Sequence, residues 1–423
     1  MKAKRKTKRS QKRLKKRAEA RSSQKRTKQL EEQALALLRD PLFLFNAKEK
    51  VHELGVVGED RNILALIVAS ITRQTPDPVS VIIQSPPSTG KSTLMKKVTE
   101  LLPPECVIER AGLSKRALAF GKVSFTNKIL FVNQYDGGKD AQLFIRLTQS
   151  GESVKHEYTT IAGRRRKTEV AERVGIPGVW TTASIEIYQD DISRFLRLTT
   201  DNSRKQNLAI CLSHALAPRT RETSDLPHWQ AAMSKIAFKS GDFEAPSEFL
   251  SYVAKHLPLD NAGVRREWDR IMSCLRAVAL LRGFESREPV NIEFADYCVV
   301  YQILEPILAS TLKHTDSQEY AVAKAAAMLN RKLRRPVTVR EIAEELRWKE
   351  RLVYKHLKTA LHRKLVRYKR GTRENNQKLI IAKHRDYRRF LPSPRSVLKH
   401  NPAIGKKVRY VDPFTGRRKR ITR

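Results

Sequence analysis

Apolar and polar positions follow two different periods in the first half of the chain. Between residues 29 and 72, apolar side chains recur at helical spacing on both sides of Pro41, which predicts helices. Residues 79–83 are a short apolar run, mostly β-branched, and such a run is typical of a buried strand in a parallel sheet. Helical and strand patterns alternate from there to about residue 201. This alternation predicts a layered α/β core with a parallel sheet.

The pattern changes after residue 201. Residues 264–281 and 294–308 have strong helical periodicity, and residues 202–315 contain no run comparable to the earlier strands. From residue 320 onward, three helical segments precede two strand-like runs at 366–371 and 378–381, which is the element order of a winged helix-turn-helix. We therefore expect an α/β core at 29–201, a helical lid domain at 202–315, a winged helix-turn-helix at 316–383, and basic tails at 1–28 and 384–423.

The chain carries a large positive charge. Lys and Arg number 84 against 44 Asp and Glu, which gives a net charge of +40. A field this strong destabilises a compact fold unless a polyanion balances it, and nucleic acid is the usual one because neutralised phosphates release condensed cations. An anionic membrane is the alternative, but no amphipathic or lipidation signal accompanies the charge. We therefore predict a nucleic acid as the partner, and no membrane.

Residues 1–28 are the most basic segment, with 15 Lys and Arg against one acid, Glu19. Such a segment cannot bury an apolar face, so we expect it to be disordered or transiently helical, either as a solvated tail or as an arm that contacts phosphates. The four cysteines are far apart without metal-ligand spacing, and the N-terminus lacks the apolar region of a secretory signal. These features predict free thiols and a cytoplasmic, nucleoid-associated protein.

The clearest motif follows the apolar run at 79–83. Residues 85–92 read Ser-Pro-Pro-Ser-Thr-Gly-Lys-Ser, which is the GxxxxGK[ST] pattern with Ser85 in place of the first Gly, and a helical pattern follows at 93–102. Backbone N–H groups of such a loop surround phosphates at a helix N-terminus, Lys91 reaches the β- and γ-phosphates, and the Ser92 hydroxyl holds Mg²⁺. We predict ATP and Mg²⁺ as cofactors, held by Ser85, Pro86, Pro87, Ser88, Thr89, Gly90, Lys91, Ser92 and Thr93.

A second apolar strand is predicted at residues 129–132. P-loop ATPases have carboxylates after this strand, which order Mg²⁺ and activate water, but here the residues are Asn133 and Gln134. Asn133 keeps an oxygen that could face the metal, whereas the amide of Gln134 cannot accept a proton near neutral pH. We therefore predict that nucleotide binding survives and that hydrolysis is slow or depends on another carboxylate. Asp136 is the nearest one, unless it only caps the turn at Gly137.

With these motifs in place, the chain from about Val51 to Leu308 resembles the AAA+ module of the minichromosome maintenance helicases and of primase-associated ATPases from mobile elements. Residues 55–60 are similar to the motif that holds adenine before the first helix of that module. Residues 133–136 stand where the family has Asp-Glu-Phe-Asp, a departure that affects hydrolysis and not the fold. The resemblance implies a ring-forming, ATP-driven DNA helicase or translocase that works with a primase or polymerase supplied in trans.

The same resemblance implies a DNA-contacting hairpin. Residues 153–161 and 168–174 are predicted to be its arms, with a turn at Ala162 and Gly163. In the family this hairpin projects into the channel of the ring. Its predicted tip carries four adjacent cations, Arg164, Arg165, Arg166 and Lys167, which would contact phosphates. The alternative is a solvated loop.

Three further assignments rest on the resemblance. Residues 179–184 look like the strand of the first sensor, with Thr182 or Ser184 facing the γ-phosphate. Asp-Ile-Ser-Arg-Phe at 191–195 resembles the arginine-finger motif, in which Arg194 would act on the nucleotide of a neighbouring subunit; the alternative is an ion pair of Arg194 with a nearby Asp. Arg265, or the adjacent Arg266, stands where the second sensor is expected.

The predicted winged helix-turn-helix is basic on the surface that such domains turn to DNA. The third helix would present Arg351, Tyr354, Lys355 and Lys358, and the wing would present Arg367, Lys369, Arg370 and Arg373. The alternative is a domain that only packs on its neighbours or binds protein. For the whole chain two functions remain open, a ring-forming replication helicase or an ATP-gated DNA clamp, loader or recruiter. A transcriptional regulator with an ATPase switch is a third.

Overall fold

The computed structural model describes residues 24–110, 124–135, 154–162, 165–173, 175–184, 187, 192–216, 223–245, 247–259, 263–312, 318–362, 366–374, 377–382 and 390–423. The chain forms two compact units. The first unit comprises Met1–Ser247, Asp269–Val300 and Lys407–Ile421, and the second comprises Glu248–Trp268, Tyr301–Lys406 and Thr422–Arg423. Both units therefore combine segments that are far apart in the sequence.

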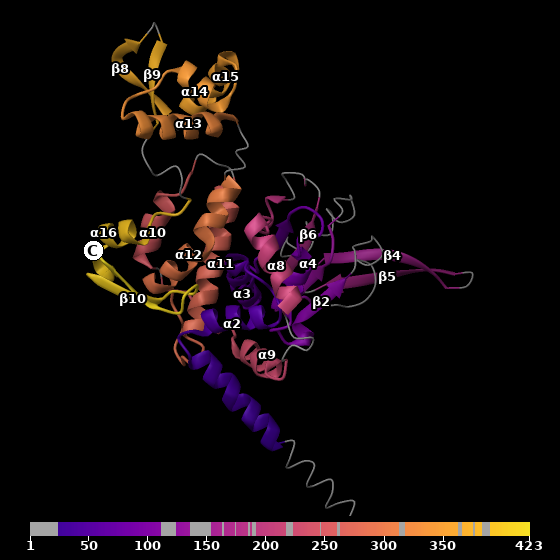
Figure 1. Ribbon diagram of the computed structural model, residues 1–423. Helices are drawn as coiled ribbons and strands as arrows, with labels where there is room; N and C mark the ends of the chain where they lie inside the picture. Colours follow the sequence, from indigo (N-terminus) through magenta and orange to yellow (C-terminus); the bar gives the residue numbers. More distant parts are fainter. Residues whose placement is uncertain are drawn as a thin grey trace, which may run out of the picture. The chain divides into compact units, whose positions relative to one another are not determined.

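The first unit is built around a five-stranded sheet (Figure 1). Its strands are β1 (Val81–Gln84), β2 (Val107–Arg110), β3 (Ile129–Val132), β6 (Gly178–Ala183) and β7 (Leu196–Leu198). They lie in the order β2-β3-β6-β1-β7, and every neighbouring pair is parallel. The predicted α/β core with a parallel sheet is therefore confirmed. Because all strands run the same way, their carboxyl ends meet at one edge, where ligands bind in open α/β sheets.

The central strands of the sheet are buried on both faces, as is typical of a parallel sheet, whereas the edge strand β2 ends in the exposed residues Glu109 and Arg110. All residues of β3 and β6 are buried, and Trp180 at the centre of β6 is fully enclosed. One face packs a cluster that includes Ile82, Leu130, Val132 and Phe195. Burial of one such side chain contributes about 1.5–3 kcal/mol, so these strands form the stable frame on which the loops at the sheet edge are held.

Helices precede and follow this sheet. A helix at residues 24–39 leads into α2 (Phe43–Glu53) and α3 (Asp60–Ile71), and α3 packs against both α2 and α4 (Lys91–Thr99). Ten of the twelve residues of α3 are buried, so this helix is central to the packing of the unit. The short 3₁₀ turns η1 (Thr72–Gln74) and η2 (Pro104–Cys106) connect helices to strands. Within the described part of the chain, no helix is long and apolar enough to cross a membrane.

The region after the sheet is helical, as its periodicity predicts. It contains α8 (Arg204–Leu216), α9 (Leu226–Lys235), α10 (Glu248–Lys255), α11 (Val264–Arg282) and α12 (Phe294–Leu312). The described residues of 202–315 contain no strand. The buried guanidinium of Arg73 fastens α9 to the body of the unit, because it donates to the carbonyl oxygens of Ser70 (3.0 Å) and Met233 (2.7 Å).

A separate two-stranded antiparallel hairpin lies between β3 and β6 in the sequence (Figure 1). Its strands are β4 (Val154–Ala162) and β5 (Arg165–Arg173), and Ala162 pairs with Arg165. Ala162, which was predicted to lie in the turn, is therefore the last residue of β4. Arg165, Arg166 and Lys167, which were predicted at the tip, are the first three residues of β5. The structure does not describe Arg164.

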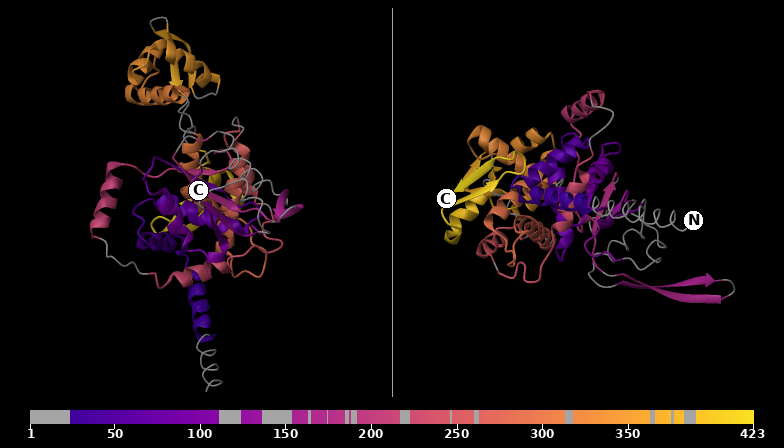
Figure 2. Two further views of the ribbon diagram at one scale, coloured as in Figure 1. Left: turned by 90° about the vertical axis from the view of Figure 1, so that its right-hand side faces the viewer. Right: turned by 90° about the horizontal axis from the view of Figure 1, so that it is seen from below.

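The C-terminal segment differs from the expected tail. Residues 390–423 contain α16 (Pro394–His400), the 3₁₀ turn η4 (Pro402–Ile404), and a hairpin of β10 (Lys407–Val411) and β11 (Arg418–Thr422), drawn in yellow in Figure 2. In the first unit, the turn of this hairpin is held at Phe414. The carbonyl oxygen of Phe414 accepts from Lys48 Nζ (3.1 Å), and its ring lies 5.2 Å from the guanidinium of Arg61. Contacts with residues more than 350 positions away order this segment, and a local pattern cannot reveal them.

In the second unit, a buried carboxylate holds the start of the C-terminal segment. The two oxygens of Glu305, on α12, accept from the backbone N–H groups of Phe390 (3.0 Å) and Leu391 (2.7 Å). All three residues are buried. Further along, Tyr252 of α10 shares a hydrogen bond of 3.0 Å with Ser396 of α16. The Glu305 carboxylate therefore holds residues 390 and 391 against α12.

The Glu305 contact leads to a stability prediction. Glu305→Ala is expected to lower the free energy of unfolding of the second unit by about 3 kcal/mol, because two buried N–H groups lose their acceptor. Urea unfolding at constant pH measures this loss. Glu305→Gln keeps one oxygen acceptor, so its free energy of unfolding should lie between those of the unaltered protein and of Glu305→Ala. Equal stability of all three proteins would contradict the assigned role.

Within the second unit, three helices and a hairpin have the element order predicted for a winged helix-turn-helix. They are α13 (Gln318–Leu333), α14 (Val339–Leu346), α15 (Glu350–His362), β8 (Val366–Glu374) and β9 (Gln377–Ala382). Val322, Ile342, Val353 and Ile380 share one buried cluster, to which all three helices and the hairpin contribute. Val337 adds a bridge to the hairpin through two hydrogen bonds with Ile380 (3.0 and 2.7 Å).

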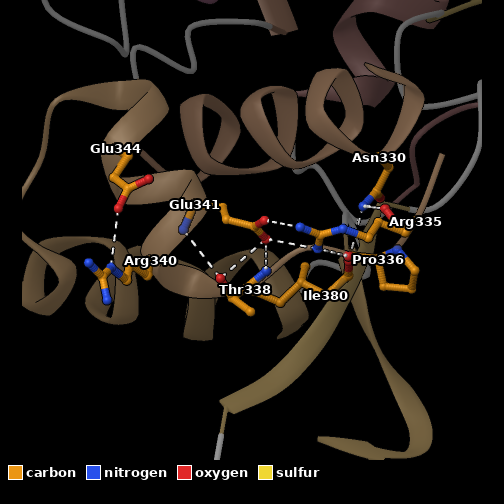
Figure 3. Close-up of polar contacts among 8 residues, drawn as sticks. All are labelled: Asn330, Arg335, Pro336, Thr338, Arg340, Glu341, Glu344 and Ile380. Atoms are coloured by element: carbon orange, nitrogen blue, oxygen red, sulfur yellow. Dashed lines mark hydrogen bonds and ion pairs between the residues drawn. The ribbon is translucent and has the colours of Figure 1, made fainter. Parts of the chain in front are cut away.

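The turn into α14 is fixed by a capping box (Figure 3). The Thr338 hydroxyl accepts from the backbone N–H of Glu341 (3.3 Å), and the Glu341 carboxylate accepts from the backbone N–H of Thr338 (2.8 Å). Arg335 pairs with the same carboxylate, and both contacts to Glu341 lower the pKa of that carboxyl. Satisfying these terminal groups sets where α14 begins.

Candidate nucleotide-binding site

The predicted phosphate loop lies at the carboxyl edge of the sheet. It leaves β1 at Gln84 and enters α4 at Lys91, two residues earlier than predicted. Ser88 and Gly90 have positive φ angles of 61° and 78°, so the chain turns sharply just before the helix. A Cβ placed on Gly90 would meet no atom within 4 Å, and no side chain caps α4. The N-terminus of α4 therefore opens onto free space, which suits an anion.

Lys91 is the cation of this loop. Its side chain is only 7% exposed, and its Nζ donates to the carbonyl oxygens of Ser85 (2.9 Å) and Pro86 (2.6 Å). Burial lowers the pKa of the Lys91 ammonium from its usual value. The ammonium is thus held against the loop by two neutral acceptors. Phosphate oxygens would be stronger acceptors for it, because they carry charge.

Ser85 has a role that explains the departure from the usual glycine. Its hydroxyl donates to the carbonyl of Gln84 (2.7 Å) and accepts from the backbone N–H of Thr200 (2.9 Å). Its own backbone N–H donates to Ala183 on β6 (3.2 Å). The Ser85 hydroxyl therefore joins the start of the loop to the segment that follows β7, a contact that glycine could not make.

The remaining predicted loop residues lie around this frame. The Thr89 hydroxyl donates to the carbonyl of Pro86 (3.0 Å), which closes the loop on itself. Pro86, Pro87 and Ser88 are exposed, as are Ser92 and Thr93 in the first turn of α4. The structure thus brings all nine predicted phosphate-loop residues together.

The end of β3 carries the two amides. Asn133 continues the strand pairing, since its backbone N–H donates to Arg110 (3.1 Å), and its Nδ2 donates to Oε1 of Glu109 (3.4 Å). Gln134 is exposed. Asp136, the carboxylate suggested as an alternative acid, lies outside the described residues. For Mg²⁺, the Ser92 hydroxyl and the side-chain amide oxygen of Asn133 are fitting ligand types, but both are neutral.

At the end of β6, the structure distinguishes the two residues that the sequence offered for the first sensor, Thr182 and Ser184. Thr182 is buried, and its hydroxyl donates to the backbone carbonyl oxygen of Asn133 (2.6 Å). The backbone N–H of Tyr135 donates to Thr182 in turn (2.8 Å). Thr182 therefore holds the end of β3 in place. Ser184 is exposed just beyond the end of β6, so its hydroxyl is the one open to a ligand.

This difference is testable. Thr182→Val is expected to lower the free energy of unfolding by about 1–2 kcal/mol, because the Asn133 carbonyl loses its donor in a buried position. Thr182→Ser retains the hydroxyl and serves as the matched control. Denaturant unfolding would show the loss. An unchanged midpoint for Thr182→Val would contradict the structural role of this hydroxyl.

Arg194 lies at the edge of the sheet opposite to the phosphate loop. It precedes β7, whose Leu196 is in register with Val81 at the start of β1. Arg194 therefore stands near the amino ends of the strands, away from Lys91 of the same chain. Its suggested ion-pair partners, Asp190 and Asp191, lie outside the described residues. Arg265 and Arg266 are both exposed in the first turn of α11, so exposure does not distinguish them.

The motif at 55–60 is tied to the segment after β7. Glu59 adopts a positive φ of 62°, and its carboxylate accepts from the backbone N–H of Asp201 (2.7 Å). Gln206 of α8 donates to the carbonyl of Val57 (2.6 Å), close to where a side chain on Gly58 would lie. Burial raises the pKa of Glu59. These contacts hold residues 57–59 against the segment that follows β7, beside the carboxyl edge.

The comparisons with known proteins bear on this arrangement. Residues 30–235 match the family model described as "MTBMA_p00010 P-loop domain". This segment is a P-loop domain. The match covers the sheet, the phosphate loop and α4, and it supports nucleotide binding by this segment. A search of curated proteins found no match.

Solved structures similar to the chain include a full-length MCM homologue from Methanopyrus kandleri, at 13% identity and a TM-score of 0.42. The match covers 65% of this chain and 60% of that one, so the chain spans less than two thirds of its relative. NtrX from Brucella abortus in complex with ATP is similar at 12% identity and a TM-score of 0.25, over 72% of this chain and 69% of that one. Likenesses this remote carry no argument about function.

Sequence reasoning missed one residue at the carboxyl edge of the sheet, beside Asn133. Glu109 is exposed near the end of β2 and contacts Asn133. The available signal was a short apolar run, Val107 and Ile108, that ends in an acid between the phosphate loop and β3. Nothing local shows that this run is the neighbour of β3, so the acid could not be assigned to the site.

The DNA-facing surface predicted for the winged helix-turn-helix is exposed. Arg351, Tyr354, Lys355 and Lys358 all lie on the open face of α15, while Val353, Leu357 and Ala360 are buried beneath. Arg367 and Lys369 are exposed on β8. The side chains of Arg370 and Arg373 lie outside the described residues. The four residues predicted to face outward on α15 are therefore all exposed.

Proposed function

We propose that this protein binds ATP with Mg²⁺ and acts on DNA as a ring-forming AAA+ helicase or translocase in replication of a chromosome or mobile element. The observation that carries the proposal is the phosphate loop at the carboxyl edge, where Lys91 and the open N-terminus of α4 converge. Lys91 would donate to the β- and γ-phosphates, and Ser92 and Asn133 would hold the metal. Bound Mg²⁺ would neutralise charge on the phosphates.

Two basic surfaces support DNA as the partner. The strip of Arg351, Lys355 and Lys358 on α15 suits a phosphate backbone, because lysine and arginine gain affinity by displacing condensed cations. The strand β5 begins with Arg165, Arg166 and Lys167 at the turn of the long hairpin. The net charge of +40 agrees with a polyanionic partner. Neither surface favours a particular base sequence.

Self-association is supported by Arg194 and by α8. Arg194 lies at the far edge from Lys91, so it could serve as an arginine finger only for the nucleotide of another copy. Helix α8 stands apart in Figure 2 and exposes Leu208, Leu212 and Leu216 by 58%, 51% and 81%. A leucine stripe at this spacing is more stable when it is covered. A primase or polymerase would act in trans, in the cytoplasm at the nucleoid.

A second function is favoured by one specific feature, the amides Asn133 and Gln134 at the end of β3. With little hydrolysis, ATP binding alone would set the state of the protein. It would then act as an ATP-gated DNA clamp, loader or recruiter.

The test measures ATP binding, phosphate release and assembly on one preparation. Light scattering with and without ATP and single-stranded DNA would report ring formation, and phosphate release would report turnover. ATP-dependent assembly with DNA-stimulated release supports the helicase. Assembly and DNA binding without release support the clamp. DNA binding should also weaken steeply with salt. A protein that binds neither ATP nor DNA would refute both functions.

A further inference from the structure

The catalytic edge of the P-loop domain lacks carboxylates at positions 133 and 134, but a carboxylate stands next to them. β2 and β3 are parallel neighbours, with Glu109 in register with Phe131 and Arg110 in register with Val132. The pairing continues one residue further, because the Asn133 N–H donates to Arg110. Glu109 and Asn133 are therefore diagonal neighbours on adjacent strands, although 24 positions separate them in the sequence.

Strand alternation places Glu109 on the same face of the sheet as Asn133. Side chains two residues apart share a face, so Asn133 follows Phe131, the partner of Glu109. The opposite face is the apolar cluster with Leu130 and Val132, against which Ile108 packs. Thr182, which is in register with Ile83 of β1, also faces the side of Asn133, since its hydroxyl reaches the Asn133 carbonyl.

The contact between Asn133 and Glu109 has a direction. The Asn133 amide donates its Nδ2–H to Oε1 of Glu109 at 3.4 Å. An aspartate at this position could not donate and would repel the glutamate. The amide that weakens the usual metal position is thus the group that allows a carboxylate to approach from β2. Glu109 is exposed, so water can reach its carboxylate.

We propose that Glu109 is the carboxylate that activates water for ATP hydrolysis in this protein, in place of the acid missing at Gln134. This inference rests on the proposed ATP-binding function. As the water oxygen bonds to the γ-phosphorus, the bond from that phosphorus to the β–γ bridging oxygen breaks, and its electron pair leaves with ADP. The proton of the water passes to the Glu109 carboxylate and then to solvent. Asn133 positions the carboxylate through its Nδ2–H.

The experiment compares phosphate release from saturating Mg²⁺-ATP, with single-stranded DNA present, among full-length variants. Glu109→Gln is expected to lower kcat roughly 100-fold, as loss of a general base does, and to change the Kd for ATP less than twofold. Glu105→Gln is the matched control, because Glu105 is an exposed glutamate just before β2, and it should keep full activity. Glu109→Gln combined with Gln134→Glu should recover at least tenfold of the lost rate.

A further readout separates catalysis from metal binding. The Mg²⁺ concentration for half-maximal activity should be the same in the unaltered protein and in Glu109→Gln. If excess Mg²⁺ restores Glu109→Gln, the residue is a metal ligand and the proposal is overturned.

Several other results would also overturn the proposal. These are full activity of Glu109→Gln, failure of Gln134→Glu to rescue it, and a protein that binds ATP but never releases phosphate. Loss of activity in Asp136→Asn, with Glu109→Gln unaffected, would assign the base to Asp136 instead. Calorimetry of ATP binding distinguishes failure of the proposed function from failure of the Glu109 assignment. If the unaltered protein binds no ATP, the proposed function itself fails; if it binds ATP and only the kinetic results disagree, the assignment of Glu109 fails alone.

Discussion

Lys91→Met is expected to weaken ATP binding by roughly 100-fold, since a charge-assisted contact to phosphate is lost from a buried position. Methionine is the informative replacement because the stem of Lys91 is buried, with the residue 7% exposed, and methionine keeps much of that volume. The ammonium now donates to Ser85 and Pro86, and phosphate oxygens are its expected partners in the complex. Isothermal titration calorimetry with Mg²⁺-ATP measures the change in Kd.

Lys96→Met is the matched control for this prediction. Lys96 is an exposed lysine on the same helix, and its replacement removes one charge without touching the phosphate loop. It should leave the Kd within about twofold of the unaltered protein. Thermal unfolding of both variants would show that α4 is intact. Equal affinities for Lys91→Met and Lys96→Met would mean that the loop does not hold the triphosphate.

The second large effect is a gain of activity. Asn133→Asp combined with Gln134→Glu is expected to raise kcat for ATP hydrolysis roughly 100-fold, because it supplies a charged metal ligand at the end of β3 and adds a general base there besides Glu109. Phosphate release at saturating Mg²⁺-ATP measures the change. Gln134→Met offers similar volume without a base and should give no gain. A double variant no faster than the unaltered protein would show that the amides do not limit turnover.

The single variant Asn133→Asp should respond to metal. It replaces the Nδ2–H that donates to Glu109 by a second carboxylate at the same site. Two carboxylates this close repel each other unless a cation lies between them. We therefore expect Asn133→Asp to unfold at a lower temperature in the presence of a chelator and to recover with Mg²⁺. A chelator-independent midpoint would argue against the contact between residues 109 and 133.

Local signals were sufficient for the elements that build the frame. The apolar run at 79–83, followed by Gly90 and Lys91, was sufficient to locate the phosphate loop, because strand, loop and helix are consecutive in the chain. The outward face of α15 followed from helical periodicity alone. The absence of acids after β3 was equally readable, since it concerns two adjacent residues. Each of these features depends on neighbours within a few positions.

Features that depend on strand order were out of reach. Ser85 looked like a weakened motif until its hydroxyl was seen to accept from Thr200, 115 positions away. Thr182 looked as suitable for a sensor as Ser184 until its hydroxyl was found on the Asn133 carbonyl. The basic end of the chain looked like a tail, but its hairpin is fastened at Phe414 to a lysine near the start.

By itself, the amino-acid sequence determined that this protein has a P-loop α/β core, a helical region after it, three helices with a hairpin, and amides in place of the usual acids. Periodicity and short motifs carry that information because they reflect backbone geometry within a few residues. Only the tertiary structure decided which strand lies beside β3, and hence that Glu109 reaches Asn133. Sheet order arises from contacts between distant segments, and no local pattern records which of them become neighbours.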